Sequence, residues 1–261
     1  MKILSTEMAG NYQHRSLQRG HLVFTSLICY NGKLIFLDSH LERLLKGADF
    51  LFPKLGWIQK QDELKRYIEN AIGPTTILAD DNYYFRLTIF DDSIFMERRT
   101  WGKNEDFLKM TTALKIKTPG LFPSFLKLSN YVEADLELSL ARIKNYDDIL
   151  FVDNSDNITE ASTSNVFVVK SDGTIISPSP SSMILDGIIR KKLFEKLQNF
   201  GFNIQEAPLK REELLKAREI WLTNSVKGLR FVLQYEDSIF EKENSTFQKV
   251  IEIFGRYGEL V

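Results

Sequence analysis

The sequence has few of the residues on which many common active sites depend. It contains 261 residues but a single cysteine, Cys29, and only three histidines. One cysteine excludes an internal disulfide and any metal site built from several cysteines. The histidines His14, His21 and His40 lack the H-E-x-x-H spacing of a zinc protease helix. We therefore expect no metal site, and the chemistry must come from other side chains.

Long apolar runs and an excess of charge of one sign are also missing. No segment approaches the roughly 20 apolar residues that cross a membrane as a helix, and the first residues, MKILSTE, lack the apolar run of a secretory signal. With 34 Lys plus Arg against 35 Asp plus Glu, the chain has no general attraction to nucleic acid or to anionic membranes. The sequence predicts a cytoplasmic protein that acts on a small molecule, without a nucleic-acid or membrane partner.

Three familiar motifs are absent: the phosphate loop G-x-x-x-x-G-K-[ST], the dinucleotide turn G-x-G-x-x-G and the hydrolase elbow G-x-S-x-G. What is present is a mixture of strand and helix patterns. Asn31-Gly32 between two apolar runs predicts a hairpin over His21–Phe36, followed by a helix that Asp38 or Ser39 would cap. The alternation of strands and helices favours an α/β (α+β) architecture.

A cluster of helix and strand breakers divides the chain. Two prolines and a glycine lie within TPGLFP, residues 118–123, which no regular element accommodates. We therefore predict an N-terminal α/β domain at 1–117, a linker at 118–123 and a larger C-terminal domain at 124–261. The last strand of the first domain is expected over Lys109–Lys117, and the second domain is expected to open with a long helix over Pro123–Lys144.

One lysine follows this linker in an apolar setting. Lys127 lies between Phe125, Leu126 and Leu128, and apolar neighbours favour the uncharged amine that forms an imine with an aldehyde. A single lysine of this kind is more often a surface residue with an apolar stem. The other motifs of the chain decide between the two interpretations.

Three further segments have polar groups in a pattern that fits a phosphorylated, electron-withdrawing cofactor. Glu160 precedes a run of small hydroxyl residues and a buried strand, although such an acid is also common in turns. Gly187 opens a helix whose N-terminus offers free N–H groups to a phosphate. Arg43, in HLERL, and Ser225, in LTNS, add a cation and a hydroxyl that also suit a phosphate.

Together these segments resemble the fold-type IV enzymes that use pyridoxal 5′-phosphate (PLP), also called class IV aminotransferases. The segment TEASTSNVF, residues 159–167, is similar to the family pattern T-E-x-[ST]-x-[ST]-N-[VIL]-F. It follows the K-x-x-N lysine, Lys127 to Asn130, by about 30 residues. The patterns H-x-x-R-L at 40–44 and L-x-G-[IV]-x-R at 185–190 complete the resemblance, which covers about residues 20–232.

The resemblance implies a role for each matching residue. Lys127 should carry the cofactor as an imine and move protons, and Glu160 should contact the pyridine nitrogen, which keeps the ring electron-withdrawing. Leu185 should pack against one face of the ring. The family fold places the site between a smaller and a larger domain, and its members are usually homodimers. The expected phosphate contacts are Arg43, the backbone N–H groups of Ile188 and Ile189, and the hydroxyl of Ser225.

The substrate-side residues favour one branch of this family. The segments Phe24-Thr25-Ser26 and LTNSVKG, residues 222–228, resemble 4-amino-4-deoxychorismate lyases, which release pyruvate and p-aminobenzoate in folate biosynthesis. Thr25 or Ser26 would then help to protonate the departing enolpyruvate. Ile89 stands where many relatives have an arginine, so Arg98 or Arg99 is a candidate for binding substrate carboxylates.

Two alternatives remain open. An aminotransferase of the branched-chain or D-amino-acid type would use the same cofactor and the same lysine. A relative repurposed for binding is the other alternative, since Gly20-His21-Leu22 departs from the G-D-G that family members often have there. The retained Lys127 and Glu160 argue against mere binding.

Overall fold

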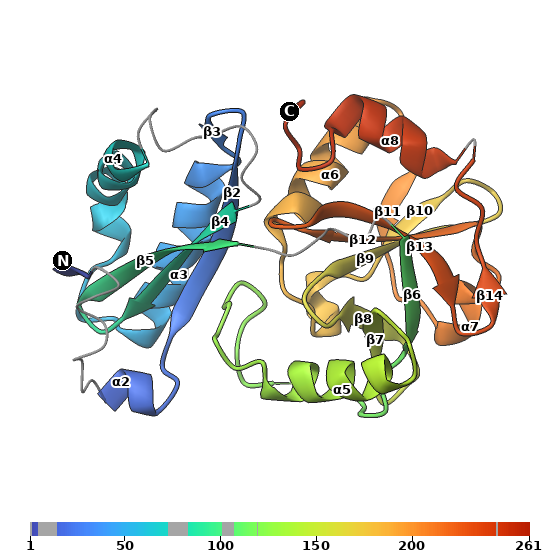
Figure 1. Ribbon diagram of the computed structural model, residues 1–261, viewed down its shortest axis with the longest axis horizontal. Helices are drawn as coiled ribbons and strands as arrows, with labels where there is room; N and C mark the ends of the chain where they lie inside the picture. Colours follow the sequence, from blue (N-terminus) through green and yellow to red (C-terminus); the bar gives the residue numbers. More distant parts are fainter. Residues whose placement is uncertain (1, 5–14, 73–82, 101–106, 119, 244) are drawn as a thin grey trace. The chain divides into compact units, whose positions relative to one another are not determined.

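The computed structural model describes residues 2–4, 15–72, 83–100, 107–118, 120–243 and 245–261. These residues form two compact units (Figure 1). The first unit comprises Met1–Lys103 together with Phe125–Asn130, and the second comprises Asn104–Ser124 and Tyr131–Val261. Each unit has its own sheet and is described by itself.

The first unit is a five-stranded sheet with helices on one face (Figure 1). Its strand order is β1-β5-β4-β2-β3, and all neighbouring pairs are antiparallel except β1 and β5. Leu41, Leu44 and Leu45 of α3 pack with Val23, Leu27 and Leu87 in the apolar core of the unit. The elements are β1 Lys2–Leu4, α2 Arg15–Gln18, β2 Val23–Tyr30, β3 Lys33–Leu34, α3 Leu37–Leu51, the 3-10 turn η1 Ile58–Lys60, α4 Gln61–Ala71, β4 Tyr83–Phe90 and β5 Ser93–Thr100.

The predicted hairpin is confirmed, and the helix start after it differs from the prediction. Asn31 and Gly32 join β2 to β3 with positive φ angles of 47° and 79°. The helix α3 begins at Leu37 after Phe36, whose φ of 54° is left-handed, and no side chain caps it. Asp38 and Ser39, predicted as caps, lie inside the first turn, because the helix already begins at Leu37, directly after the two-residue turn Ile35-Phe36.

The second unit is built on a larger, curled sheet with the strand order β11-β10-β9-β12-β13-β6-β7-β8, to which β14 adds by pairing with β13. The helices α6 and α8 pack on β12, and α5 packs on β7. The strands are β6 Phe107–Thr112, β7 Asp148–Val152, β8 Ile158–Ala161, β9 Asn165–Val169, β10 Ile175–Ser177, β11 Ile204–Glu206, β12 Glu219–Asn224, β13 Gly228–Tyr235 and β14 Ser238–Ile239; the helices are α5 Val132–Ile143, the 3-10 turn η3 Pro180–Ser182, α6 Ile188–Asn199, α7 Arg211–Leu214 and α8 Thr246–Phe254.

The unit boundaries differ from those predicted at the linker. The strand β6 pairs with β13 and β7 and so belongs to the second sheet, whereas the sequence assigned it to the first domain. The long helix expected over Pro123–Lys144 is shorter, because α5 begins at Val132 and residues 125–130 run beside β2 of the first unit. Pro119, in the predicted linker, lies outside the described residues. Long-range strand pairing, which local sequence does not encode, decides both differences.

The mixed α/β class is confirmed by these two sheets and their covering helices. Within the described ranges, none of the helices is long and apolar enough to span a membrane.

Candidate functional site

The lysine singled out by the sequence lies on an irregular segment that is fixed to β2. Leu128 forms an isolated antiparallel bridge with Val23. The N–H of Phe24 donates to the Lys127 carbonyl at 3.0 Å, and the N–H of Ser129 donates to the Leu22 carbonyl at 3.3 Å. These backbone bonds hold the segment as a short extra strand, so that Lys127 is carried on a rigid support.

Close packing behind this segment adds to its rigidity. Leu126 is buried in the core of the first unit, and Phe125 and Leu128 pack against that core. A Cβ atom at Gly47 of α3 would approach Val23 Cγ2 to 2.7 Å and Leu126 Cδ1 to 3.2 Å. Glycine is therefore required for α3 to pack this closely against β2 and the lysine segment. The three apolar neighbours of Lys127 thus anchor its segment to this core.

The amine of Lys127 lies over an aromatic ring of β2. Its Nζ atom is 4.9 Å from the centroid of Phe24. Side chains alternate along a strand, and Val23 and Leu27 belong to the core that α3 covers. Phe24 and Ser26 therefore belong to the opposite face, with Lys127.

The same alternation separates the two hydroxyl residues that the sequence could not distinguish. Thr25 is on the face covered by α3 and is fully buried. Its Oγ1 lies 2.6 Å from His40 Nδ1 and accepts a hydrogen bond of 3.0 Å from Arg43 Nη2. Ser26 is half-buried on the Phe24 face. Of the two, Ser26 is the hydroxyl that shares a face with the lysine.

An arginine that the sequence analysis did not select lies on the Lys127 face. Arg86 of β4 is directly opposite Ser26 in the strand register. Its guanidinium carbon is 3.5 Å from the Phe24 ring centroid, and its Nη2 donates to Ser129 Oγ at 2.8 Å. The signal for Arg86 in the sequence is its position in YYFRLTIF, where strand alternation puts it with Tyr84 and Thr88 instead of with the core residues.

The two arginines proposed from the sequence are less well placed than Arg86 to bind a substrate carboxylate. Arg98 lies over the ring of Tyr83, with 4.9 Å between its guanidinium carbon and the centroid, on the helix-covered face. Arg99 is on the opposite face but is held by Glu97, with 2.9 Å between Arg99 Nη2 and Glu97 Oε1, near the end of β5. Arg86 is therefore the better candidate for a substrate carboxylate.

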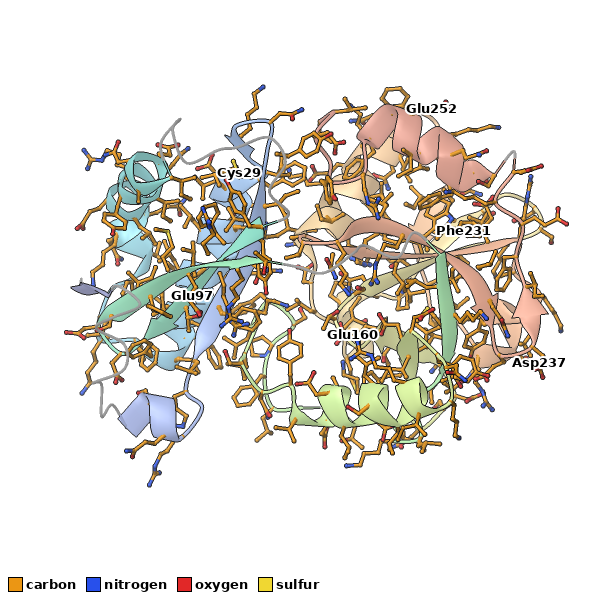
Figure 2. The ribbon with its side chains drawn as sticks, viewed as in Figure 1. Cys29, Glu97, Glu160, Phe231, Asp237 and Glu252 are labelled. Carbon is orange, nitrogen blue, oxygen red and sulfur yellow. The ribbon has the colours of Figure 1, made fainter. Side chains whose placement is uncertain are left out.

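In the second unit, Glu160 is near the end of β8 (Figure 2). Its side chain is 19% exposed. One oxygen, Oε2, accepts a hydrogen bond of 2.8 Å from the Leu185 N–H, and the other, Oε1, pairs with Lys117 Nζ. The carboxylate is thus held in one orientation by a backbone donor and a cation. Lys117 was not selected from the sequence, because no local pattern relates it to an acid 43 residues away.

Both backbone polar groups of Leu185 are hydrogen-bonded to side chains. While its N–H donates to Glu160, its carbonyl accepts a hydrogen bond of 2.8 Å from Asn165 Nδ2. A Cβ atom at Gly187 would come within 1.9 Å of Asn165 Oδ1, so only glycine fits at this position. The segment from Leu185 to the start of α6 is therefore locked to β8 and β9, which supports the grouping of these motifs by the sequence.

The N-terminus of α6 has the features of a phosphate site. Gly187 is its N-cap and no side chain caps the first turn, in which Ile188 and Ile189 lie, so their N–H groups have no partner within the helix. Thr223 of β12 is directly opposite Asn165 in the strand register. Its Oγ1 is buried and has no hydrogen-bond partner among the described residues. A buried unpartnered hydroxyl next to a helix N-terminus fits a group with several acceptor oxygens.

The loop that carries Ser225 is organised by one asparagine. The Oδ1 atom of Asn224 accepts hydrogen bonds from Val226 N–H at 3.0 Å and Lys227 N–H at 2.7 Å. Its Nδ2 atom donates to Ser164 Oγ at 3.0 Å. Asn224 thus shapes the turn around Ser225 and ties it to the hydroxyl-rich segment that follows Glu160.

Two of the hydroxyls in that segment belong to a buried network. Ser162 Oγ donates to Asp148 Oδ1 at 2.5 Å, and Arg230 Nη2 donates to Ser164 Oγ at 3.1 Å. Asp148 and Arg230 are both buried, with 3.5 Å between Oδ2 and Nη2. A buried charge pair needs such hydroxyl partners, which explains why small hydroxyl residues follow Glu160.

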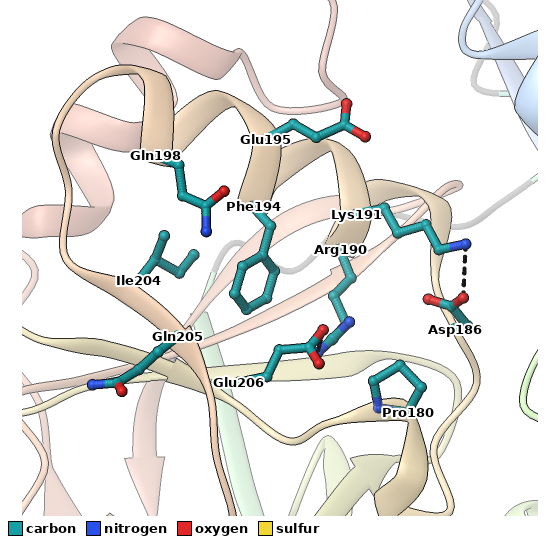
Figure 3. A pocket seen from close by; sticks show the side chains of 10 residues that line it. All are labelled: Pro180, Asp186, Arg190, Lys191, Phe194, Glu195, Gln198, Ile204, Gln205 and Glu206. Atoms are coloured by element: carbon teal, nitrogen blue, oxygen red, sulfur yellow. Dashed lines mark hydrogen bonds and ion pairs between the residues drawn. The ribbon is translucent and has the colours of Figure 1, made fainter.

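The arginine that ends the L-x-G-[IV]-x-R pattern has a structural role. Arg190 is 1% exposed, and its guanidinium donates to Ser177 Oγ, to the Pro178 carbonyl and to Glu206. Figure 3 shows Arg190 and Glu206 beside a surface pocket between α6 and β11, where Lys191 pairs with Asp186. Arg190 therefore anchors α6 to the sheet, which fixes the direction of the helix N-terminus.

The described groups fit a cofactor with a phosphate, an aldehyde and a ring nitrogen. The helix N-terminus and Thr223 suit the phosphate, Glu160 suits a protonated ring nitrogen, and Lys127 supplies an amine. Each of these groups is positioned by contacts within its own unit. The expectation that the two sets of groups form one site stays a prediction.

Comparison with known proteins gives the context for this arrangement. A family model described as Amino-transferase class IV matches residues 22–235. A “Probable branched-chain-amino-acid aminotransferase” of Aquifex aeolicus (strain VF5) is 25% identical over 221 residues, which are 78% of this chain and 70% of that protein. Branched-chain-amino-acid aminotransferase 1, mitochondrial, of Arabidopsis thaliana is 34% identical over 125 residues, which are 47% of this chain and 31% of that protein.

Solved structures share the fold along nearly the whole chain. A “Putative 4-amino-4-deoxychorismate lyase” of Legionella pneumophila has a TM-score of 0.80 at 21% identity and covers 97% of this chain and 98% of its own. The branched-chain amino acid aminotransferase of Escherichia coli has a TM-score of 0.82 at 23% identity, over 94% and 89% of the two chains. An aminotransferase of Brucella abortus bound to PLP has a TM-score of 0.78 at 21% identity, over 93% and 91%. These matches show the fold.

Proposed function

Because the chain belongs to the class IV aminotransferase family, whose cofactor is PLP, we propose that it is an aminotransferase acting on an amino acid. The observation that carries the proposal is the rigidly supported Lys127, whose Nζ lies over Phe24 on the face that also bears Arg86. The names of the curated relatives favour a substrate of the branched-chain type over the lyase reaction that the sequence alone favoured.

The candidate cofactor contacts described above each have a task in this proposal. Bound PLP supplies an aldehyde carbon and an electron-withdrawing ring. The amine of Lys127 would hold the cofactor and would move a proton to and from the amine-bearing carbon of the substrate. The carboxylate of Glu160 would face the protonated ring nitrogen, and Leu185 would pack against the ring.

The proposal gives the phosphate of the cofactor several candidate contacts. Arg43 supplies a cation, the N–H groups of Ile188 and Ile189 supply backbone donors, and Ser225 supplies a hydroxyl. We add Thr223, because its buried Oγ1 lacks a partner among the described residues. A phosphate with several acceptor oxygens would satisfy this hydroxyl.

We assign recognition of the substrate carboxylate to Arg86. Its guanidinium is stacked on Phe24 and hydrogen-bonded to Ser129, two residues from Lys127. A guanidinium fixed in this way presents a planar fork to a carboxylate with little loss of side-chain entropy. Arg86→Lys should therefore raise KM for the amino acid more than it lowers kcat.

A second candidate function, the 4-amino-4-deoxychorismate lyase, is favoured by one observation. Ser26 has a hydroxyl on the face of Phe24, Arg86 and Lys127, where a proton donor to a departing enolpyruvate is needed. Thr25, on the face covered by α3, is the poorer donor. The nearly complete mutual coverage with the Legionella pneumophila structure is compatible with this candidate.

One set of assays on the purified protein with PLP distinguishes the candidates. Conversion of the bound cofactor to its pyridoxamine form by leucine, isoleucine or valine alone supports the aminotransferase. Equal release of pyruvate and p-aminobenzoate from 4-amino-4-deoxychorismate supports the lyase. A protein that does neither, while still binding PLP, would favour the binding-only alternative.

We also propose that the chain forms a homodimer, as the resemblance implies. The helix α5 exposes an apolar stripe made of Val132, Leu136, Leu140 and Ile143. This spacing puts all four on one side of the helix, and such a stripe is typical of an interface. Light scattering should give twice the chain mass for the parent protein and a monomer for Leu136→Glu. A monomeric parent would contradict the dimer.

A further inference from the structure

The proposed function leaves one buried titratable group without a task. His40 of α3 is 1% exposed, and its ring is hydrogen-bonded to Thr25, which is fully buried on β2. The distance from His40 Nδ1 to Thr25 Oγ1 is 2.6 Å. Arg43 donates to the same Oγ1 atom at 3.0 Å. The three side chains thus form a chain of hydrogen bonds that ends at a phosphate-binding candidate.

The direction of each hydrogen bond follows from the groups involved. A guanidinium has only donors, so Thr25 Oγ1 accepts from Arg43. Among the described residues, His40 Nδ1 is the remaining partner of the Thr25 hydroxyl. Leaving a buried hydroxyl proton unpaired is unfavourable, so Thr25 donates to Nδ1. The imidazole is then neutral and carries its proton on Nε2.

The surroundings of His40 agree with a neutral ring. Burial lowers the pKa of His40 well below its usual range, and the positive charges of Arg43 and Lys127 lower it further. The ring therefore remains an acceptor at Nδ1 throughout the physiological pH range.

We propose that His40 and Thr25 are positioning residues that hold the Arg43 guanidinium in the orientation that binds the phosphate of the cofactor. This inference rests on the proposed role of Arg43 in PLP binding. An arginine side chain on a helix has many rotamers, and fixing it on binding costs entropy. A hydrogen bond from one Nη atom to a hydroxyl oxygen that is itself fixed by a buried ring removes most of that freedom before the ligand arrives.

The alternative is that Thr25 and His40 only join α3 to β2. The two ideas differ in what they predict for a ligand with and without its phosphate. A positioning role affects PLP and leaves pyridoxal, which lacks the phosphate, unchanged. A purely structural role changes the affinity for both ligands equally.

The experiment therefore measures the dissociation constants of PLP and of pyridoxal for the cofactor-free protein. Thr25→Val removes the hydroxyl at nearly constant volume, and Thr25→Ser keeps it. We expect Thr25→Val to weaken PLP binding about tenfold with pyridoxal unchanged, and Thr25→Ser to restore PLP binding to within about twofold. If Thr25→Val does not fold, His40→Leu and His40→Asn form the same comparison, because the Asn oxygen replaces Nδ1 as the acceptor.

A control variant separates this inference from the proposed function. Arg43→Gln should abolish the preference for PLP over pyridoxal. If it does not, the assignment of Arg43 to the phosphate is wrong. If Arg43→Gln has this effect but Thr25→Val and His40→Leu weaken neither ligand or both equally, the positioning role is wrong. A ¹⁵N spectrum of the cofactor-free protein at neutral pH should also show His40 protonated on Nε2, and protonation on Nδ1 would overturn the proposal.

Discussion

The two units contribute different kinds of groups. The first unit contributes side chains from separate elements: Lys127 and Arg86, which the pairing of β2 with β4 and with residues 127–129 puts on one face, and Arg43 of α3, which donates to Thr25 of β2. The second contributes Glu160 and backbone groups around the start of α6, which are joined by direct contacts of neighbouring motifs. The first unit thus presents cationic side chains suited to an imine bond and to anionic groups, and the second presents a carboxylate suited to a ring nitrogen and backbone N–H groups suited to a phosphate.

The largest effect is expected from removing Lys127 of the first unit. Lys127→Ala removes the amine that forms the covalent bond and transfers the proton, so kcat should fall roughly a thousandfold. Steady-state kinetics with saturating PLP measures this loss. Lys249→Ala, at an exposed position of α8, is the matched control and should behave as the parent. Near-parental turnover by Lys127→Ala would assign the chemistry to another lysine.

The second prediction concerns the carboxylate of Glu160 in the second unit. Glu160→Gln keeps the size of the side chain but removes its negative charge. The protonated ring nitrogen then loses its anionic partner. We expect kcat to fall about a hundredfold while the cofactor stays covalently attached to Lys127. Glu195→Gln, on the exposed side of α6, serves as the control. Activity within about twofold of the parent would exclude Glu160 from this role.

The contrast between the units also explains what the sequence could predict. In the second unit, Glu160, Asn165, Leu185 and Gly187 lie in motifs whose side chains and backbone meet directly, so the pattern was sufficient to group them. In the first unit, the choice between Thr25 and Ser26 depends on strand phase, which the sequence did not fix.

Non-local contacts account for the other omissions. Arg86, Lys117 and Thr223 gain their relevance from partners 25 or more residues away, and no local pattern relates them. The hairpin and the fold class were accessible because turn chemistry and alternation are local signals. The membership of β6 was not, because it depends on pairing with β13, more than 100 residues further along.

The third prediction sharpens the phosphate assignment in the second unit. Gly187→Ala would bring a methyl group to 1.9 Å from Asn165 Oδ1. Either the Asn165 side chain or the start of α6 must shift, which should cost about 1–3 kcal/mol of unfolding free energy and weaken PLP more than pyridoxal. Chemical denaturation and ligand titration measure the two effects. Gly120→Ala, where the nearest atom is 3.9 Å from the added Cβ, is the control. Equal stability of both variants would contradict the close packing.

The smallest effect concerns the pH dependence of the first unit. The pKa of His40 lies below the 6.5 of a free imidazole, through burial and then the charges of Arg43 and Lys127. Below pH 6.5 the unfolded chain therefore binds a proton that the folded chain does not, and stability falls until the pH passes the folded pKa. Urea midpoints of the cofactor-free protein should decrease from pH 7.5 to pH 5, and His40→Asn should have a flatter dependence. Parallel curves would contradict a buried neutral His40.

The central claim is that Lys127 is the residue that holds the cofactor. The most direct measurement is to add PLP to the purified protein, reduce with borohydride, digest, and locate the modified residue by mass spectrometry. The account predicts a single stable pyridoxyl modification on the peptide that contains Lys127. Modification at a different lysine, or none at all with PLP in excess, would contradict it.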